Sequence, residues 1–186
     1  MLIGMDISKW NDGIDVNAGE FTIMKISEGQ TYRDPKANDF RRKFDGRQLL
    51  GAYHFLRADI KGNHPYKEAE NFVNGLLEYD LLYKSLLVCD YEAGSLGHEA
   101  YLLQFLEGVK IMTGVKPIVY TGSSATKGLP NIAKAGYELW IAHYNVKSPK
   151  IYNWKSALAW QFTSKPFDVD IFNGNENDWY LRTIKQ

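Results

Sequence analysis

Cysteine is nearly absent from this sequence: Cys89 is the single one among 186 residues. One thiol excludes an internal disulfide, and its place inside an apolar run is more typical of a packed core residue than of a nucleophile. The four histidines are scattered without an H-x-x-H or H-x-x-x-H spacing, and no C-x-x-C pair occurs. We therefore expect no metal ion and no other cofactor.

An excess of charge, a long apolar run and an export leader are also missing. The 22 basic residues balance the 22 acidic ones, which gives no electrostatic reason to expect binding to nucleic acid or to anionic lipid. No apolar run reaches the roughly 18 residues of a membrane span. No basic and apolar leader precedes Leu2. The sequence thus predicts no nucleic-acid partner, no membrane partner and no export signal.

Strand-like runs and aromatic residues, which make up 14% of the chain, are plentiful. The runs lie at 2–7, 21–26, 49–56, 86–92, 117–121, 138–144, 157–163 and 167–172. Helical patterns lie at about 35–47, 65–79 and 97–113, with a weaker one near 124–135. The connections between the last three strands are too short for a full crossover helix. We predict an α/β fold, a single irregular β/α barrel of eight strands forming one domain over residues 1–186.

The stretch "SLLVCDYEAG" at residues 85–94 ends an apolar run with two acids. Side chains alternate along a strand, so Asp90 and Glu92 point one way while Cys89 and Tyr91 point the other. The run is apolar on both faces, as in a buried parallel strand, and barrels place their chemistry at the carboxyl ends of such strands. Two like charges roughly 6–7 Å apart, from the strand rise, should raise at least one pKa. The alternative is a solvated strand end with two surface acids.

Further acids occur near other strand ends. Asp6 lies toward the end of the first run, Asp168 and Asp170 lie in the last, and the first and eighth strands of a barrel are neighbours. These acids can therefore face Asp90 and Glu92 across one mouth. Aromatic residues gather near the same strand ends, and rings that stack on sugars beside carboxylates are what a carbohydrate cleft needs. Glu28 is interpreted as a turn acid bonding nearby amides.

Eight motifs occur in order: "IGMDISKWNDGIDV", "IMKISEG", "GAYHFLRA", "VCDYEAG", "IVYTG", "LWIAHYN", "AWQFTS" and "FDVDIFNG". With them the chain resembles the family 25 glycoside hydrolases, the N-acetylmuramidase lysozymes of phages and bacteria, over residues 2 to about 174. The resemblance implies a flattened barrel whose final strands lack the usual helices. It also implies a phage endolysin type of enzyme that acts on peptidoglycan glycan strands without a cofactor.

The resemblance implies roles for individual residues. Glu92 matches the general acid that protonates the leaving oxygen, and Asp90 matches the acid that orients the substrate N-acetyl group or stabilises the charged transition state. Asp6 and Asp168 match the other two acids of the cleft. Family members often have D-x-N where this chain reads Asp168-Val169-Asp170, so either aspartate could face the cleft; we favour Asp168. The substrate-binding residues implied are Tyr53, Phe55, Tyr120, Trp140, Tyr144 and Gln161.

The leading hypothesis is a muramidase that hydrolyses the β-1,4 bond between N-acetylmuramic acid and N-acetylglucosamine. The alternatives are a catalytically silent sugar-binding module and a hydrolase that uses the acids as ligands for Mg²⁺ or Ca²⁺. Trp10 is as plausibly a packing as a binding residue. For the mechanism we favour retention by attack of the substrate's own acetamido oxygen; the runner-up is inversion, with Asp6 or Asp168 activating water.

The expected site of action is the bacterial cell wall. Without a leader, we favour an endolysin made in the host cytoplasm and released during phage lysis, with secretion as the alternative. We expect a monomer. Only "NENDWYLRTIKQ" follows residue 174, which leaves no room for a separate wall-anchoring domain in this chain.

Overall fold

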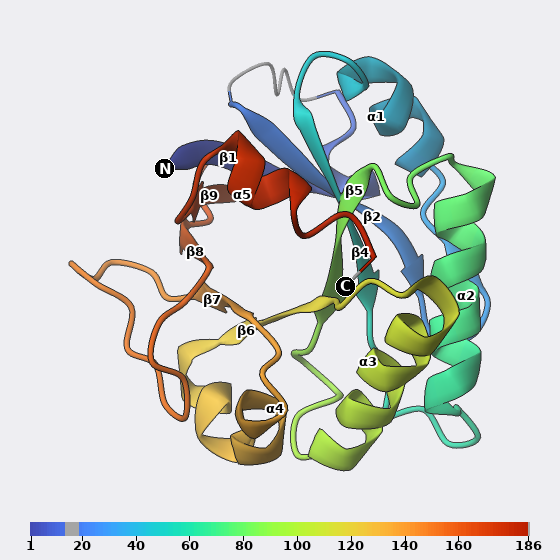
Figure 1. Ribbon diagram of the computed structural model, residues 1–186, viewed down its shortest axis with the longest axis vertical. Helices are drawn as coiled ribbons and strands as arrows, with labels where there is room; N and C mark the ends of the chain where they lie inside the picture. The colour runs from blue at the N-terminus through green and yellow to red at the C-terminus, as the bar shows by residue number, and fades with distance from the viewer. Residues whose placement is uncertain (14–18, 186) are drawn as a thin grey trace.

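Eight strands close into a barrel in the computed structural model, which describes residues 1–13 and 19–185 (Figure 1). The strand order is β1-β9-β8-β7-β6-β5-β4-β2, and β1 also pairs with β2, which closes the ring. The short β3 is added outside the ring by pairing with β2. The bounds are β1 Leu2–Ile7, β2 Phe21–Glu28, β3 Tyr32–Arg33, β4 Leu49–Phe55, β5 Ser85–Asp90, β6 Ile118–Gly122, β7 Leu139–Ala142, β8 Ala159–Thr163 and β9 Val169–Phe172.

The last strand of the barrel runs against its neighbours. The strands β1, β2, β4, β5, β6, β7 and β8 pair in parallel, whereas β9 is antiparallel to both β8 and β1. The beginning of β9 therefore lies at the carboxyl end of the other strands. Asp168, immediately before β9, reaches the same mouth as Asp90 at the end of β5.

Alternation along the strands separates two apolar clusters. One fills the barrel and includes Phe21, Val88 and Phe172, all 1% exposed or less. The other lies between the outside of the barrel and the helices, and it includes Cys89 and Tyr91. The strand period of two thus decides which side chains of β5 can reach the mouth from inside, and it places Asp90 on the inner face.

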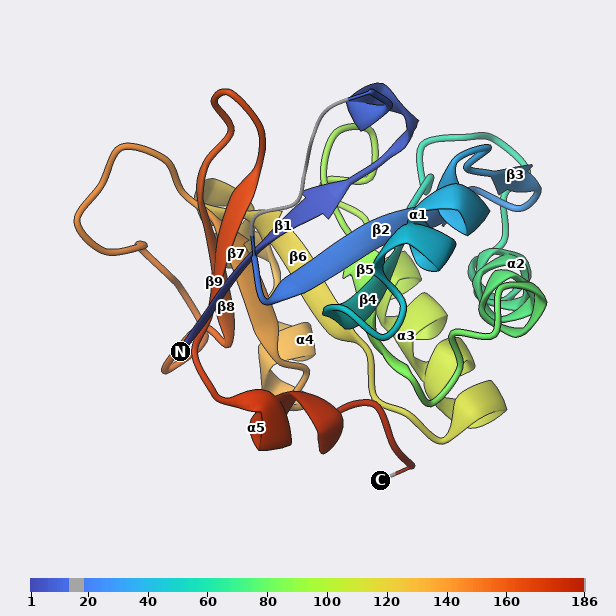
Figure 2. The same cartoon turned by 90° about the horizontal axis from the view of Figure 1, so that it is seen from above.

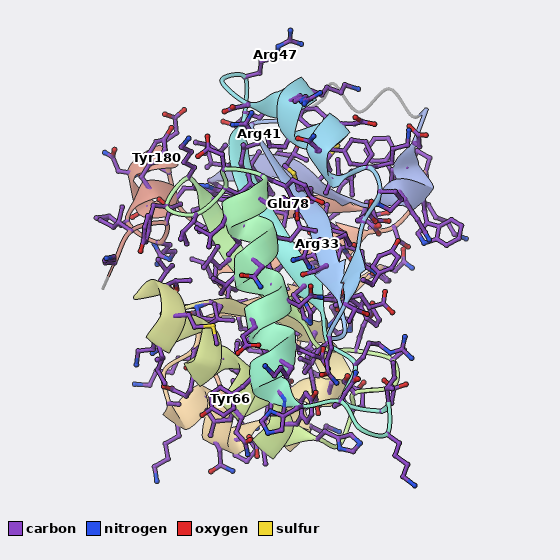
Figure 3. All side chains as sticks on the ribbon, turned by 90° about the vertical axis from the view of Figure 1, so that its right-hand side faces the viewer. Arg33, Arg41, Arg47, Tyr66, Glu78 and Tyr180 are labelled. Atoms are coloured by element: carbon purple, nitrogen blue, oxygen red, sulfur yellow. The ribbon has the colours of Figure 1, made fainter. Side chains whose placement is uncertain are left out.

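Helices cover one side of the barrel, and another helix lies at the end opposite the mouth. In Figure 1, α1, α2 and α3 lie on the right of the strands, and in Figure 3 α2 runs along the outside from Tyr66 to Glu78. The short α5 lies at the end opposite the β8–β9 hairpin (Figure 2), and its Trp179 is buried in the interior cluster. The helix bounds are η1 Lys9–Asn11, α1 Ala37–Phe44, α2 Pro65–Glu78, α3 Glu99–Thr113, η2 Ser123–Gly128, α4 Pro130–Lys134 and α5 Glu176–Tyr180.

The predicted fold class is confirmed, and the differences are local. β7 and β8 are parallel, yet residues 143–158 join them without a helix, as the short connection indicated. The weak helix expected near 124–135 is divided into η2 and α4, because Pro130 begins a new helix. The sequence reading missed η1, β3 and α5, each of five residues or fewer, which are too short for hydrophobic periodicity to register.

Three strand boundaries were drawn wrongly at functionally important positions. β5 ends at Asp90, so Glu92 belongs to the following loop, and Tyr144 lies beyond β7 rather than within it. Glu28, expected beyond its strand, is the last residue of β2. Glu28 is included because a register shift between Lys25 and Ser27 lets β2 continue along β4.

Cys89 should be chemically silent in the folded protein. Its side chain is fully buried in the outer cluster, and burial, together with the nearby Asp90 charge, raises the pKa of the thiol well above its usual value. Incubation of the native protein with a thiol reagent should leave activity unchanged, with labelling appearing only after denaturation. Rapid stoichiometric labelling of native Cys89 with loss of activity would contradict this orientation.

Candidate active site

The barrel mouth has a floor of hydrogen-bonded polar side chains. Gln161 of β8 donates from Nε2 to Asp6 Oδ2 at 2.5 Å, and its Oε1 accepts the Tyr120 hydroxyl at 2.9 Å and the Tyr144 hydroxyl. Trp140 donates from Nε1 to Asp170 Oδ1 at 2.9 Å. Strands β1, β6 and β8 thus share one hydrogen-bond network that holds the carboxyl group of Asp6, while the bond between Trp140 and Asp170 joins β7 to β9.

Asp168 and Asp170 both belong to this mouth, but at different depths. Asp170 is fully buried next to Asp6, while Asp168 is partly exposed. Burial raises the pKa of Asp170 well above its usual value, and the nearby charge of Asp6 adds to the shift. The same strand parity therefore puts both aspartates inside the barrel, with Asp168 nearer to solvent.

Burial is the main cause of the raised pKa values in this cluster. It raises the pKa of Asp6 to about 7, with Asp168 as the next contributor. Burial and then the charges of Glu92 and Asp6 raise the pKa of Asp90 well above its usual range. Burial and Asp168 also raise the pKa of Glu92, which Lys25 partly offsets. The expected effect of one acid on the other is present in one direction, from Glu92 on the pKa of Asp90, and desolvation outweighs it.

Lys25 is a cation inside the mouth that the sequence reading did not single out. Its Nζ pairs with Glu28 Oε2 at 2.6 Å and lies 4.7 Å from the centre of the Phe55 ring. Glu28 also accepts from Arg57 at 2.7 Å. The prediction that Glu28 bonds nearby amides is wrong, because its side-chain oxygens accept from these two cations. Burial raises the pKa of Glu28, but the two cations outweigh it and hold the pKa below its usual value. Lys25 has the same strand parity as Phe21 and Ile23, which point into the barrel, so the sequence could have shown that Lys25 points inward too.

The predicted substrate-binding side chains divide into floor and rim. Tyr120, Trp140 and Gln161 are at most 8% exposed and form the floor, so the Trp140 ring offers little surface for stacking. Tyr144 is 39% exposed and stands at the rim. The remaining two, Tyr53 and Phe55, are partly buried on the inner face of β4.

Trp10 is 81% exposed, so a packing role is wrong for this residue. Ser8 caps the turn η1 and accepts from Trp10 N, while Asn11 accepts from Ser8 N, so a closed capping box presents the ring to solvent. Trp10 stands over a cleft of about 640 Å³ beside the mouth. The cleft is lined by Lys9, Lys25, Glu28, Tyr32, Arg57, Ile60 and neighbouring residues.

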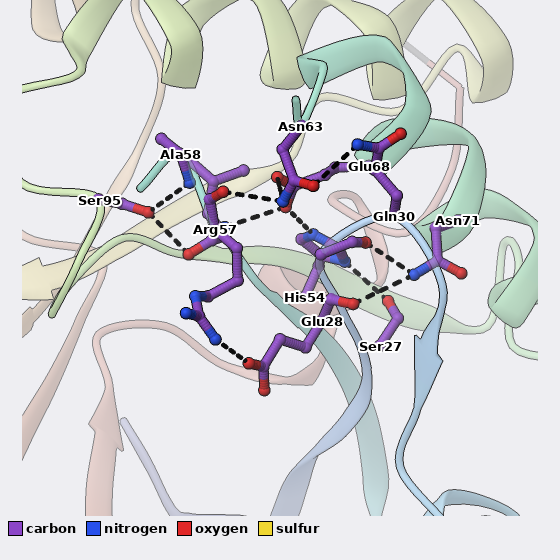
Figure 4. Close-up of polar contacts among 12 residues, drawn as sticks. Ser27, Glu28, Gln30, His54, Arg57, Ala58, Asn63, Glu68, Asn71 and Ser95 are labelled. Carbon is purple, nitrogen blue, oxygen red and sulfur yellow. Dashed lines mark hydrogen bonds and ion pairs between the residues drawn. The ribbon is translucent and has the colours of Figure 1, made fainter. Parts of the chain in front are cut away.

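A buried polar network supports the loop on the far side of this cleft (Figure 4). His54 contacts Ser27 Oγ at 2.8 Å and Glu68 Oε2 at 2.9 Å, and all three side chains are buried. Glu68 also accepts from the backbone N of Arg57 and from Asn63. The network is closed to solvent, which suits a structural role: it anchors the loop that carries Arg57.

Within residues 1–13 and 19–185, no group of three or more histidine, cysteine, aspartate or glutamate side chains is arranged to hold a metal ion. At the mouth, Asp6 accepts from the Gln161 amide and Asp170 from the Trp140 indole. Among the same residues, no helix has the length and apolar character that a membrane crossing requires.

Comparison with known proteins identifies similar sequences and structures. Residues 5–171 match the family described as glycosyl hydrolases family 25. The uncharacterized protein YegX of Escherichia coli K12 is 25% identical, over 92% of this chain and 69% of its own. The CTP1L endolysin structure has a TM-score of 0.81 and 26% identity, covering 97% of this chain and 70% of that one. A bacterial lysozyme from Streptomyces coelicolor, at 19% identity, shares the fold with a TM-score of 0.81 over 98% of this chain and 96% of its own.

Proposed function

This chain belongs to family 25 of the glycosyl hydrolases, and from that premise we propose that it is an N-acetylmuramidase. The bond cleaved is the β-1,4 bond that follows N-acetylmuramic acid in peptidoglycan. The observation that carries the proposal is the set of carboxyls at one barrel mouth, Asp6, Asp90, Glu92 and Asp168, with raised pKa values. The likeness to the CTP1L endolysin supports a lytic role.

Glu92 is the proposed proton donor. No hydrogen bond to its carboxyl is made by a side chain of the described residues, and its raised pKa favours the protonated form that an acid catalyst needs. Glu92 gives its proton to the leaving glycosidic oxygen as the bond to the anomeric carbon breaks. It later takes a proton from the water that hydrolyses the intermediate.

Asp90 is the proposed partner of the N-acetyl group on the muramic acid. Its Oδ1 is buried without a partner among the described residues, which leaves an acceptor for the acetamido N–H. Held in this way, the acetamido oxygen attacks the anomeric carbon and forms a cyclic intermediate, which water then opens. Asp6 and Asp168 flank the developing positive charge.

This mechanism predicts retention of the anomeric configuration, because two displacements occur at one carbon. Proton NMR of the first-formed product should show the β anomer, and peptidoglycan de-N-acetylated on muramic acid should resist cleavage. An initial α product would instead indicate inversion, with Asp6 or Asp168 activating water.

Mass spectrometry of borohydride-reduced digestion products from purified peptidoglycan tests the bond assignment. Reduced muramic acid ends are expected. Reduced glucosamine ends would indicate a glucosaminidase, and failure to clear a cell-wall suspension would favour the silent sugar-binding alternative. Insensitivity to a chelator is expected, since the acids are assigned no ligand role.

For the biological setting we propose an endolysin that reaches the wall from the host cytoplasm during phage lysis. The likeness to a known endolysin supports this choice over secretion. Expression in a bacterial cytoplasm should be harmless until the inner membrane is permeabilised, whereas lysis without permeabilisation would favour secretion. We also propose a monomer, which light scattering tests.

A further inference from the structure

The cleft beside the carboxyl cluster is built differently from the mouth itself. Its walls come from η1, the ends of β2 and β3, and the loop after β4 that Glu68 anchors. The cleft adjoins the acids through Lys25, which lines it and also acts on the pKa values of Asp90 and Glu92.

Cations converge on the cleft around one aromatic ring. The ammonium groups of Lys9 and Lys25 lie 5.3 Å and 5.6 Å from the centre of the Tyr32 ring. Glu28 is shared between Lys25 and Arg57, and Arg57 also pairs with Asp59 at 2.9 Å. Lys9, by contrast, pairs with none of the carboxylates of residues 1–13 and 19–185; its ammonium group lies 4.8 Å from the centre of the Trp10 ring, and Lys9 lines the cleft.

Apolar surface stands next to these charges. Trp10, 81% exposed, and Ile60, 42% exposed, both line the cleft. An indole held out by a capping box, beside an exposed branched side chain, is costly to leave in water and is typical of a binding surface. The combination suits a ligand that has small apolar groups and a carboxylate.

We propose that this cleft is a stem-peptide pocket that binds the acidic peptide attached to the muramic acid at the cleaved bond. This inference rests on the proposed function, which places muramic acid next to Glu92. The peptide leaves that sugar through its lactyl ether, and two extended residues span about 7 Å. A free carboxylate on the second residue then meets Lys9, while the methyl groups of the lactyl unit and the first residue face Trp10 and Ile60.

The sharpest test uses two ligands that differ in a single functional group. N-acetylmuramoyl dipeptides with a free α-carboxylate or an amide on the second residue contain no glycosidic bond to cleave, so their binding is independent of activity. Calorimetric or NMR titration of the wild-type protein should show about five- to tenfold tighter binding of the carboxylate form. Lys9→Gln should abolish this preference.

Lys43→Gln is the matched control, because Lys43 also lies over an aromatic ring, that of Phe44 at 5.3 Å, but outside the cleft. It should retain the full preference. Equal binding of both ligands by the wild type, or an unchanged preference in Lys9→Gln, would overturn the pocket. Absence of cleavage of intact peptidoglycan would instead overturn the proposed function, and the two failures are therefore distinguishable.

Discussion

Glu92→Gln should lower the rate of peptidoglycan hydrolysis by about 10²–10⁴-fold. The substitution keeps the size and the hydrogen-bonding capacity of the side chain but removes the proton that the leaving oxygen requires. In the wild type, activity should also fall as the pH rises through the raised pKa of Glu92, because the donor becomes ionised. This alkaline limb should disappear from the residual activity of the variant.

Turbidity clearing and product release, measured over a pH series, check this result. Glu78→Gln is the control: it makes the same chemical change on the outer face of α2 (Figure 3), where the side chain is 57% exposed, and should leave the rate unchanged. The unfolding free energy of Glu92→Gln should stay close to that of the wild type, because Glu92 lies in a loop beyond β5. A rate near that of the wild type would remove Glu92 from the role of proton donor.

Asp90→Asn should lower activity by about 10²–10³-fold and at the same time stabilise the fold at pH 7. Activity falls because the charge that steadies the acetamido group and the transition state is lost. Stability rises by about 1–3 kcal/mol because a buried carboxyl crowded by other acids is replaced by a neutral amide.

The sign of the stability effect follows from the raised pKa of Asp90 in the folded protein. A carboxyl of this kind contributes no penalty below its unfolded pKa, near 3.8, where both states are protonated. Its penalty develops as the pH rises from there toward the folded pKa. The stabilisation by Asp90→Asn should therefore be present at pH 7 and vanish below about pH 3.8.

Urea unfolding at both pH values, with Asp39→Asn as control, tests this pattern. Asp39 is 65% exposed on α1, so its neutral variant should change stability little at either pH. Destabilisation by Asp90→Asn at pH 7 would mean that the Asp90 carboxylate makes favourable contacts that outweigh its burial. That result would contradict the proposed electrostatics of the mouth.

Local pattern was sufficient to locate the eight strands of the barrel, though not all of their ends, and to assign the inner and outer faces of β5. The period of two assigned Cys89 to the helix side and Asp90 to the barrel interior, because side-chain alternation is a property of the strand itself. Short connections similarly indicated that the last strands lack crossover helices. The eight ordered motifs indicated the family and the roles of the four acids, which periodicity alone does not identify.

Only the tertiary structure decided how deeply each site residue is buried and which residues lie next to it. The antiparallel entry of β9 brings Asp168 to the mouth and leaves Asp170 buried against Trp140, a distinction that two residues of equal parity do not reveal. The structure also decided that Trp10 is exposed rather than packed, and that Lys25 pairs with Glu28 beside the acids. Parity and propensity are set by neighbours in the chain, whereas barrel closure brings together residues from both ends of it, as in the hydrogen bond between Gln161 and Asp6.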